Sequence, residues 1–292
     1  MNGILLIDKP AEWTSNDVVI KLKGILRQRR IGHSGTLDPM ATGLLVVFVG
    51  RATRAVEFAE ADSKQYIAGL RLGTTTDTQD TTGTVINQSP VNVTDEQLLS
   101  ALGRFTGEID QIPPMYSALK VNGQKLYDIA RKGGEVERKA RRITVSDISV
   151  LGRDGEDFIL DVSCSKGTYI RTLCHDIGQA LGCGGCMSSL RRVKAGVFTI
   201  DRAYSLQQVQ VAADAGNVEE MLLPVDSLFD AVPAYIADDA QMKRIKNGNE
   251  IKVDAADGQY RVYSRAGEFL MLGRSVNGIM KTVKSFFEVE VK

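Results

Sequence analysis

The segment Gly32–Gly43, with the sequence GHSGTLDPMATG, and the apolar run Leu44–Val49 that follows it are the most informative part of this 292-residue chain. The run predicts a buried strand, and the glycines before it predict a tight turn. Within the turn, Pro39 disfavours a helical backbone for Asp38, so we expect this carboxylate to be extended and held outward. Taken alone, an Asp-Pro turn of this kind is ordinarily structural.

Helices and strands are predicted on both sides of this turn. Ser15 or Asn16 can cap a helix that ends in the basic residues 27–30. Thr94 and Gln97 form a capping box ahead of an apolar helical face. Strands are expected at 66–72, 143–151 and 158–164, a loop at 74–83, a short basic helix at 125–132, another helix at about 168–181 and a short one after Tyr204.

The length and the distribution of these elements predict two domains. We assign residues 1–230 to a mixed α/β domain in which residues 110–142 form an excursion that contains Pro113 and Pro114. Residues 231–292 read as a small all-β domain, because short strands separated by Gly and Asp are expected at 250–253, 260–264, 268–276 and 280–291.

The composition is that of a globular protein, with 43% hydrophobic and 25% charged residues. The apolar run Leu44–Val49 is the longest and is far too short to span a bilayer, so we expect no membrane helix. The sequence MNGILLIDKP at the N-terminus lacks a signal-like apolar region and cleavage site, which predicts a cytoplasmic protein.

Several common classes of enzyme lack their signatures. The chain has two histidines and contains no HExxH, no P-loop and no GxGxxG. Cys183 and Cys186 form a CxxC, but a zinc site would need two more ligands from Cys164, Cys174 or His175. We favour two small residues in a tight turn after a helix, and we expect no metal, no cofactor and four reduced thiols.

The net charge of zero conceals an uneven distribution. Residues 21–54 contain seven Lys or Arg against one acidic residue, and residues 120–142 contain eight against three. Residues 203–242 contain no Lys or Arg and seven acidic residues. Such blocks suit a polyanionic partner on one face of the molecule, although solvated surface is the alternative for a charge block considered alone.

The whole of Gly32–Gly43 resembles the active-site motif of the TruB family, the tRNA pseudouridine-55 synthases, with Ser34 and Met40 where Thr and Leu are frequent. Further ordered blocks resemble the same family and cover most of residues 3–200. These blocks are LLIDKP (5–10), TSND (14–17), KQY (64–66), RLG (71–73), TDTQD (76–80), QIPPMYSALK (111–120), KGTYIR (166–171) and SSLRR (188–192). The tail resembles a PUA-type domain by position and strand pattern.

This resemblance implies an α+β fold in which a central mixed, largely antiparallel sheet carries inserted RNA-binding loops, followed by a small C-terminal β-barrel-like domain of PUA type. It implies an enzyme of the bacterial stand-alone type that isomerises uridine to pseudouridine at position 55 in the T-loop of tRNA. The expected partner is the T-arm of tRNA, bound by a monomer without a metal or cofactor. A non-catalytic tRNA-binding or RNA-folding protein and an RNA-guided synthase subunit are the alternatives.

The resemblance also assigns the site residues. Asp38 is the nucleophile that acts on a flipped-out uridine, and Arg171 is the guanidinium that favours its ionised form. Attack on the ribose, addition to the uracil ring and a route through deprotonation of the sugar remain open. Tyr66 is expected to be catalytic and to stack on the base, with His33, Tyr169, Leu190 and Asp80 as further substrate-binding or supporting residues.

Overall fold

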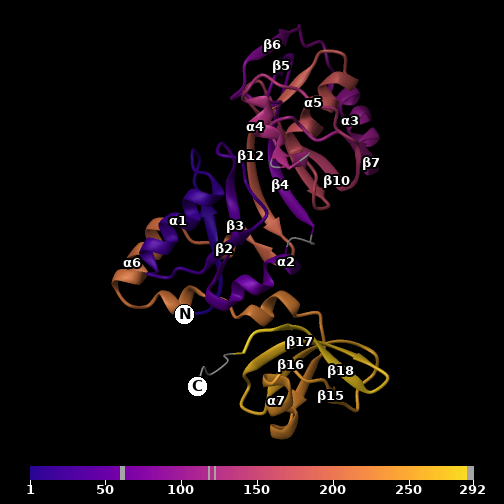
Figure 1. The fold of residues 1–292 in the computed structure, drawn as a ribbon. Coiled ribbons are helices and arrows are strands. Elements are labelled where there is room, and N and C mark those ends of the chain that lie inside the picture. Colours follow the sequence, from indigo (N-terminus) through magenta and orange to yellow (C-terminus); the bar gives the residue numbers. More distant parts are fainter. Residues whose placement is uncertain (60–62, 118, 122, 288–292) are drawn as a thin grey trace.

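The computed structural model describes residues 1–59, 63–117, 119–121 and 123–287, whose strands form two main sheets (Figure 1). The strands of the larger sheet are β1 (Gly3–Lys9), β2 (Ile31–Ser34), β3 (Thr42–Val49), β4 (Lys64–Leu72), β7 (Gly107–Gln111), β10 (Arg141–Asp154), β11 (Asp157–Cys164), β12 (Gly185–Ala195) and β13 (Phe198–Thr199). Their order is β1-β3-β12-β4-β11-β10-β7, with β2 paired to β3 and β13 to β12. Within this sheet, as far as the structure describes it, β3 and β12 are the only named strands that pair in parallel, so the predicted mixed, largely antiparallel sheet is confirmed.

The apolar run of β3 is buried on both faces of the sheet, as predicted for Leu44–Val49. Successive side chains of a strand point to opposite faces, so Val46 and Phe48 join one hydrophobic cluster while Leu45 and Val47 join another. Helices α1 (Ser15–Ile25) and α6 (Leu206–Asp214) cover the second of these faces. The turn before β3 is therefore attached to a rigid, fully buried strand.

The cap of α1 differs from the sequence prediction. Thr14, and not Ser15 or Asn16, is the N-cap, because its hydroxyl accepts from the Asp17 N–H and the Asp17 carboxylate accepts from the Thr14 N–H. This reciprocal capping box leaves the Ser15 side chain available to another partner. The helix ends at Ile25, before the basic residues 27–30.

The other half of the large sheet is covered by helices α3 (Asp95–Arg104) and α5 (Ile170–Ala180). Thr94 and Gln97 form the predicted capping box of α3. The predicted loop at 74–83 contains the short strand β5 (Thr74–Thr76), which pairs with β6 (Val85–Gln88). Side chains of β4, β10, β11, α3 and α5 form one hydrophobic cluster in this half.

Strand β12 lies at the centre of the sheet and was not predicted from the sequence. Cys183 is in a turn as expected, but Cys186 already belongs to β12. The register shift between Met187 and Ser189 interrupts the alternation of apolar residues, which hides the strand from a pattern search. All four cysteines are buried and unpaired.

The excursion predicted at 110–142 leaves the sheet at the end of β7 and returns at the start of β10. It contains β8 (Lys120–Val121), β9 (Gln124–Lys125) and α4 (Leu126–Ala130), the last within the short helix predicted at 125–132. The Tyr127 N–H donates to the Ser117 carbonyl at 3.1 Å, and Arg138 Nη1 donates to the Pro113 carbonyl at 3.2 Å. Residues 118 and 122 lie outside the described part.

The C-terminal sheet is curled and has the order β14-β16-β17-β18-β15. Its strands are β14 (Ala234–Ala237), β15 (Ile251–Lys252), β16 (Gly258–Ser264), β17 (Phe269–Val276) and β18 (Ile279–Ser285). The prediction that this tail is all-β was wrong at α7 (Asp239–Lys246), whose N-cap is Asp238. This helix was missed because its short polar sequence carries little apolar periodicity. The end of the last predicted strand, at 288–291, lies outside the described residues.

Aromatic rings join the C-terminal sheet to the larger domain. Phe229, in the short 3-10 helix Val225–Phe229, contacts Phe58 of α2 (Val56–Ala59) and Phe286 of the tail, with ring centroids 5.3 and 6.2 Å apart. Arg51, in the 3-10 helix Gly50–Ala55, donates to the Phe287 carbonyl. Two further 3-10 helices are Ile200–Arg202 and Val218–Met221. None of the described helices is both long and apolar enough to cross a membrane.

Candidate active site

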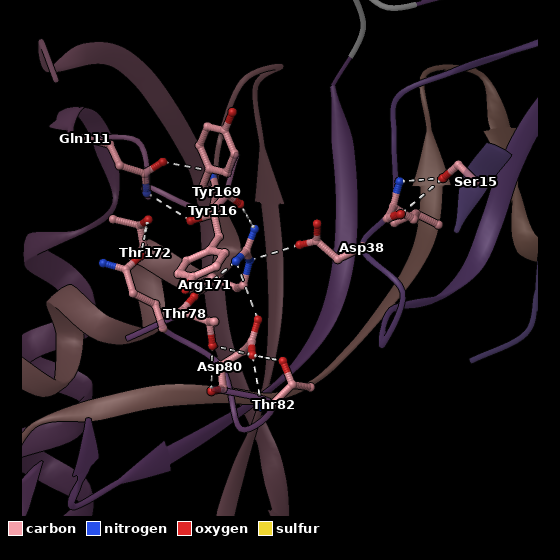
Figure 2. A network of polar contacts seen from close by, with 12 residues as sticks. Ser15, Asp38, Thr78, Asp80, Thr82, Gln111, Tyr116, Tyr169, Arg171 and Thr172 are labelled. Atoms are coloured by element: carbon pink, nitrogen blue, oxygen red, sulfur yellow. Dashed lines mark hydrogen bonds and ion pairs between the residues drawn. The ribbon is translucent and has the colours of Figure 1, made fainter. Parts of the chain in front are cut away.

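Asp38 lies in the turn between β2 and β3, and its side chain is 39% exposed. The backbone immediately before it is fixed by Ser15, a buried residue at the start of α1. Ser15 Oγ accepts from the Leu37 N–H at 2.9 Å and lies 3.2 Å from the Leu37 carbonyl, to which its hydroxyl donates (Figure 2). The turn is therefore attached to α1 by a side chain that the cap at Thr14 leaves available.

Lys9 fixes the same turn from the end of β1. Its buried ammonium donates to the Pro39 carbonyl at 3.2 Å and to the carbonyls of Pro10 and Trp13 at 2.8 and 2.7 Å. Burial lowers the pKa of Lys9 from its ordinary value to about 8, although the nearby Asp38 carboxylate favours the charged form. A fixed positive charge thus lies beneath the turn that carries Asp38.

Arg171 approaches Asp38 from the opposite half of the sheet. It stands in the first turn of α5 and is 7% exposed, and its Nε lies 2.9 Å from Asp38 Oδ2. Its Nη1 donates to the Thr78 carbonyl at 3.1 Å and its Nη2 to the Tyr116 carbonyl at 2.8 Å (Figure 2). The planar guanidinium is held on three sides, so its Nε points at the carboxylate in one fixed direction.

Asp80 is the second carboxylate beside this guanidinium. It is 5% exposed, and its Oδ2 lies 3.5 Å from Arg171 Nη1. Its Oδ1 accepts from the hydroxyl groups of Thr78 and Thr82 and from the Thr82 N–H. Two carboxylates therefore share one arginine, but they differ in exposure. Asp80 is buried and accepts three hydrogen bonds at Oδ1, whereas Asp38 is open to solvent.

Close backbone packing joins the Asp38 turn to β12. Gly43 has a φ of +97°, and a Cβ at this position would lie 2.3 Å from the Arg192 carbonyl oxygen, so only glycine fits. Arg192 is almost completely buried and donates from Nε to the Leu44 carbonyl at 2.7 Å and from Nη2 to the Gly35 carbonyl at 3.0 Å. Glycine in the turn thus allows close packing against β12, and Arg192 of β12 hydrogen-bonds to the backbone at both ends of the turn.

Tyr66 and His33 lie beside this buried arginine. Tyr66, on β4, is directly opposite Arg192 in the strand register and is 7% exposed. Burial raises the pKa of the Tyr66 phenol, and the positive charge of Arg192 partly offsets this rise. His33, on β2, is half-buried, and burial together with Arg192 lowers its pKa. Among the described residues, no hydrogen-bond partner is found for its Nδ1.

The two remaining predicted residues lie on the walls of this region. Leu190, on β12, is 8% exposed and belongs to the same hydrophobic cluster as Leu37 and Tyr66. Tyr169 is half-buried at the N-cap position of α5, two residues before Arg171. The structure therefore brings Asp38, Arg171 and Asp80 into direct contact, and it places Tyr66, His33, Leu190 and Tyr169 on the strands and helix around them.

Several residues that build the site were missed by the sequence reasoning. Lys9 and Arg192 were quoted only as parts of family blocks, and Ser15 was expected only as a helix cap. Gln111 and the Tyr116 carbonyl also reach the site from the excursion. Of these residues, only Ser15 could have been found from the sequence. Thr14 and Asp17 form the capping box, so the Ser15 hydroxyl is not needed to cap the helix. The described residues contain no group of three or more His, Cys, Asp or Glu side chains that could hold a metal ion.

This sheet, with a solvent-open carboxylate held by a buried arginine, places the chain in the pseudouridine synthase class of folds. A chain in the crystal structure of a Cbf5-Nop10-Gar1 complex superposes with a TM-score of 0.74 and 26% identity, over 98% of this chain and 85% of that one. The predicted fold class is confirmed by this likeness.

The sequence comparisons define the family. The N-terminal domain of the TruB family of pseudouridylate synthases matches residues 23–170, and the C-terminal domain of tRNA pseudouridylate synthase B matches residues 171–230. A tRNA pseudouridine synthase B of Clostridium kluyveri is 42% identical over 98% of this chain and 100% of its own length. One from Ralstonia pickettii is 46% identical over 90% of this chain and 85% of its own. The chain belongs to the TruB family of pseudouridine synthases, which confirms the resemblance found in its sequence.

Proposed function

We propose that this chain isomerises uridine to pseudouridine at position 55 in the T-loop of tRNA, with Asp38 as the nucleophile. The contact between Arg171 Nε and Asp38 Oδ2 carries the proposal, because it supplies an oriented, half-exposed carboxylate. The relatives named tRNA pseudouridine synthase B support tRNA as the substrate. Their 42–46% identity favours a stand-alone enzyme over a subunit of a larger complex, because the chain in the Cbf5-Nop10-Gar1 complex is 26% identical.

The reaction is an isomerisation that needs no redox partner. The bond between N1 of uracil and C1′ of ribose breaks, the base turns over, and a bond forms between C5 and C1′. C5 then loses its proton and N1 gains one, so atoms and electrons balance within the nucleoside. A carboxylate can assist by attack at the anomeric carbon or by addition to the ring. A metal ion is not part of this proposal.

Asp38 has the geometry that such a role requires. Arg171 binds Oδ2, while Oδ1 points away from the guanidinium and makes no hydrogen bond within the described part of the chain (Figure 2). The guanidinium orients the carboxylate, and Asp80 helps to hold the guanidinium in place. Oδ1 is therefore available to the substrate.

The extruded base is proposed to bind between the residues that surround this carboxylate. A uridine in a folded loop must be flipped out at a cost of about a few kcal/mol, which stacking in the protein offsets. Tyr66 and Leu190 are 7% and 8% exposed, so they offer the base an edge rather than a whole face. Tyr169 forms the opposite wall, and His33 contacts the loop from which the base departs.

The tRNA is proposed to bind as a T-arm to a monomer of this chain. The excursion at 110–142 follows directly on the site, since the carbonyl of Tyr116 contacts Arg171. Its eight Lys or Arg suit the phosphates of the arm. Residues 231–292 are proposed to act as an RNA-binding domain of PUA type.

The direct test is incubation with an unmodified tRNA transcript, followed by chemical mapping of pseudouridine along the RNA. A transcript with cytidine at position 55 and the variant Asp38→Asn serve as matched controls. We expect one modified site, at position 55, that depends on Asp38. Conversion at another position would contradict the assignment to the T-loop, and conversion only after addition of a separate guide RNA would favour the RNA-guided alternative.

A further inference from the structure

The start of α5 is held by a side chain from a distant strand. Gln111, the last residue of β7, is 2% exposed. Its Nε2 donates to the Tyr169 carbonyl at 3.1 Å, and its Oε1 accepts from the Tyr169 N–H at 2.8 Å (Figure 2). One amide group thus bonds both backbone polar groups of the residue that precedes α5, whose carbonyl also accepts from the Leu173 N–H at 3.0 Å.

This contact supplies from a distant strand one half of a capping box, the half in which a side chain accepts from the N-cap N–H. The N-cap of α5 is Tyr169, whose side chain makes no capping hydrogen bond, whereas Thr14, Thr94 and Ser205 each cap their own helices. The first turn of a helix has unpaired N–H groups and frays unless it is fixed. Gln111 therefore holds the N-cap residue of α5 from outside the helix.

Arg171 lies two residues after this fixed point, so its position depends on it. The guanidinium must reach Asp38 Oδ2 at 2.9 Å and at the same time the Tyr116 carbonyl at 2.8 Å. Tyr116 lies five residues after Gln111, in the same excursion from the sheet. Gln111 thus links the residue before α5, which carries Arg171, to the segment that carries the Tyr116 carbonyl.

We propose that Gln111 is a positioning residue that aligns Arg171 with Asp38 by holding both backbone groups of Tyr169 at the start of α5. The proposal rests on the proposed function for its kinetic consequence. It makes a structural prediction as well, because the Arg171 Nε–H should be protected from exchange only while Gln111 holds Tyr169. Gln111 touches no reacting atom, so its effect should appear in the rate of the chemical step rather than in tRNA affinity.

The test variant is Gln111→Met, which keeps the length of the side chain and removes both hydrogen bonds. Under single-turnover conditions with excess enzyme, the rate constant is independent of the folded fraction. We expect it to fall about 10- to 100-fold, as for a misplacement near 1 Å, while the tRNA Kd stays within about threefold. Gln208→Met is the control, because Gln208 completes the capping box of α6 and should change stability only.

Gln111→Glu provides the conservative comparison. A protonated carboxyl group can donate to the Tyr169 carbonyl and accept from its N–H, as the amide does, whereas a carboxylate can only accept. Because burial favours the neutral acid, the rate of this variant relative to the native chain should recover as pH falls. A relative rate that is flat with pH would contradict the hydrogen-bonding role.

Proton exchange of the Arg171 Nε–H, followed by NMR and assigned by its loss in Arg171→Lys, separates this inference from the proposed function. We expect exchange at least about tenfold faster in Gln111→Met than in the native chain, whether or not the chain converts tRNA. Unchanged exchange, an unchanged rate constant, or a loss of activity explained entirely by a raised Kd would each overturn the inference. An inactive native chain with the expected change in exchange would refute the proposed function alone.

Discussion

Replacing Arg171 by Lys tests the centre of the site most directly. The guanidinium contacts Asp38 at 2.9 Å, Asp80 at 3.5 Å, and the carbonyls of Thr78 and Tyr116 at 3.1 and 2.8 Å. A lysine has one nitrogen with three donors and cannot span partners that surround a planar fork. We expect Arg171→Lys to lose at least two of these contacts while it keeps the positive charge.

The size of the effect follows from those contacts. Hydrogen bonds to charged groups contribute about 1.5–3 kcal/mol each, so two lost contacts cost about 3–6 kcal/mol. At about 1.4 kcal/mol per factor of ten, the largest expected loss in the rate constant is about 10²- to 10⁴-fold. Because lysine keeps a positive charge beside Asp38, we expect the lower end, a loss of about a hundredfold in the single-turnover rate constant.

The assay is release of tritium from tRNA transcripts labelled at C5 of uridine, with enzyme in excess. Arg71→Lys is the matched control, because Arg71 forms a two-pronged ion pair with Asp157 across β4 and β11, away from the site. That variant should remain within about threefold of the native chain. A rate for Arg171→Lys within the same threefold range would refute the alignment of Asp38 by this guanidinium.

The remaining predictions concern the nucleophile, pH and salt. Asp38→Asn should abolish pseudouridine formation and leave tRNA affinity within about tenfold, measured by filter binding, and retained activity would contradict its role as nucleophile. The pKa of Lys9 is about 8 in the folded chain and 10.5 ordinarily, so between these values the unfolded chain holds more protons. The contribution of Lys9 to the unfolding free energy therefore rises with pH, by up to about 1.4 kcal/mol per pH unit. Lys9→Met should lower the slope of the unfolding free energy against pH, measured by urea titration from pH 8 to 10. Equal slopes in the two chains would contradict this. Replacing Arg141 and Arg142 with Gln should weaken tRNA binding and flatten its salt dependence, whereas Glu220→Gln should not, and an unchanged slope would mean that the excursion does not contact phosphate.

The sequence by itself determined the elements that depend on local chemistry. The apolar run Leu44–Val49 predicts a buried strand because a continuous run places apolar side chains on both faces of a sheet, and both faces are covered here. The Asp-Pro turn extends Asp38 for a steric reason that needs no neighbour. Thr94 and Gln97 cap α3 through atoms three residues apart. The family blocks added the candidate site residues, because they keep residue types at fixed spacing.

Only the tertiary structure decided which side chains hold the site together. Gln111 and Tyr169 are 58 residues apart, and Ser15 and Leu37 are 22 apart, so no periodicity or local motif pairs them. Strand β12 was hidden by a bulge and becomes visible only when it pairs with β4. Side-chain hydrogen bonds to backbone depend on where separate elements meet, and that meeting is set by the packing of the whole sheet. The sequence could therefore predict Asp38 and Arg171, but not the residues that keep them 2.9 Å apart.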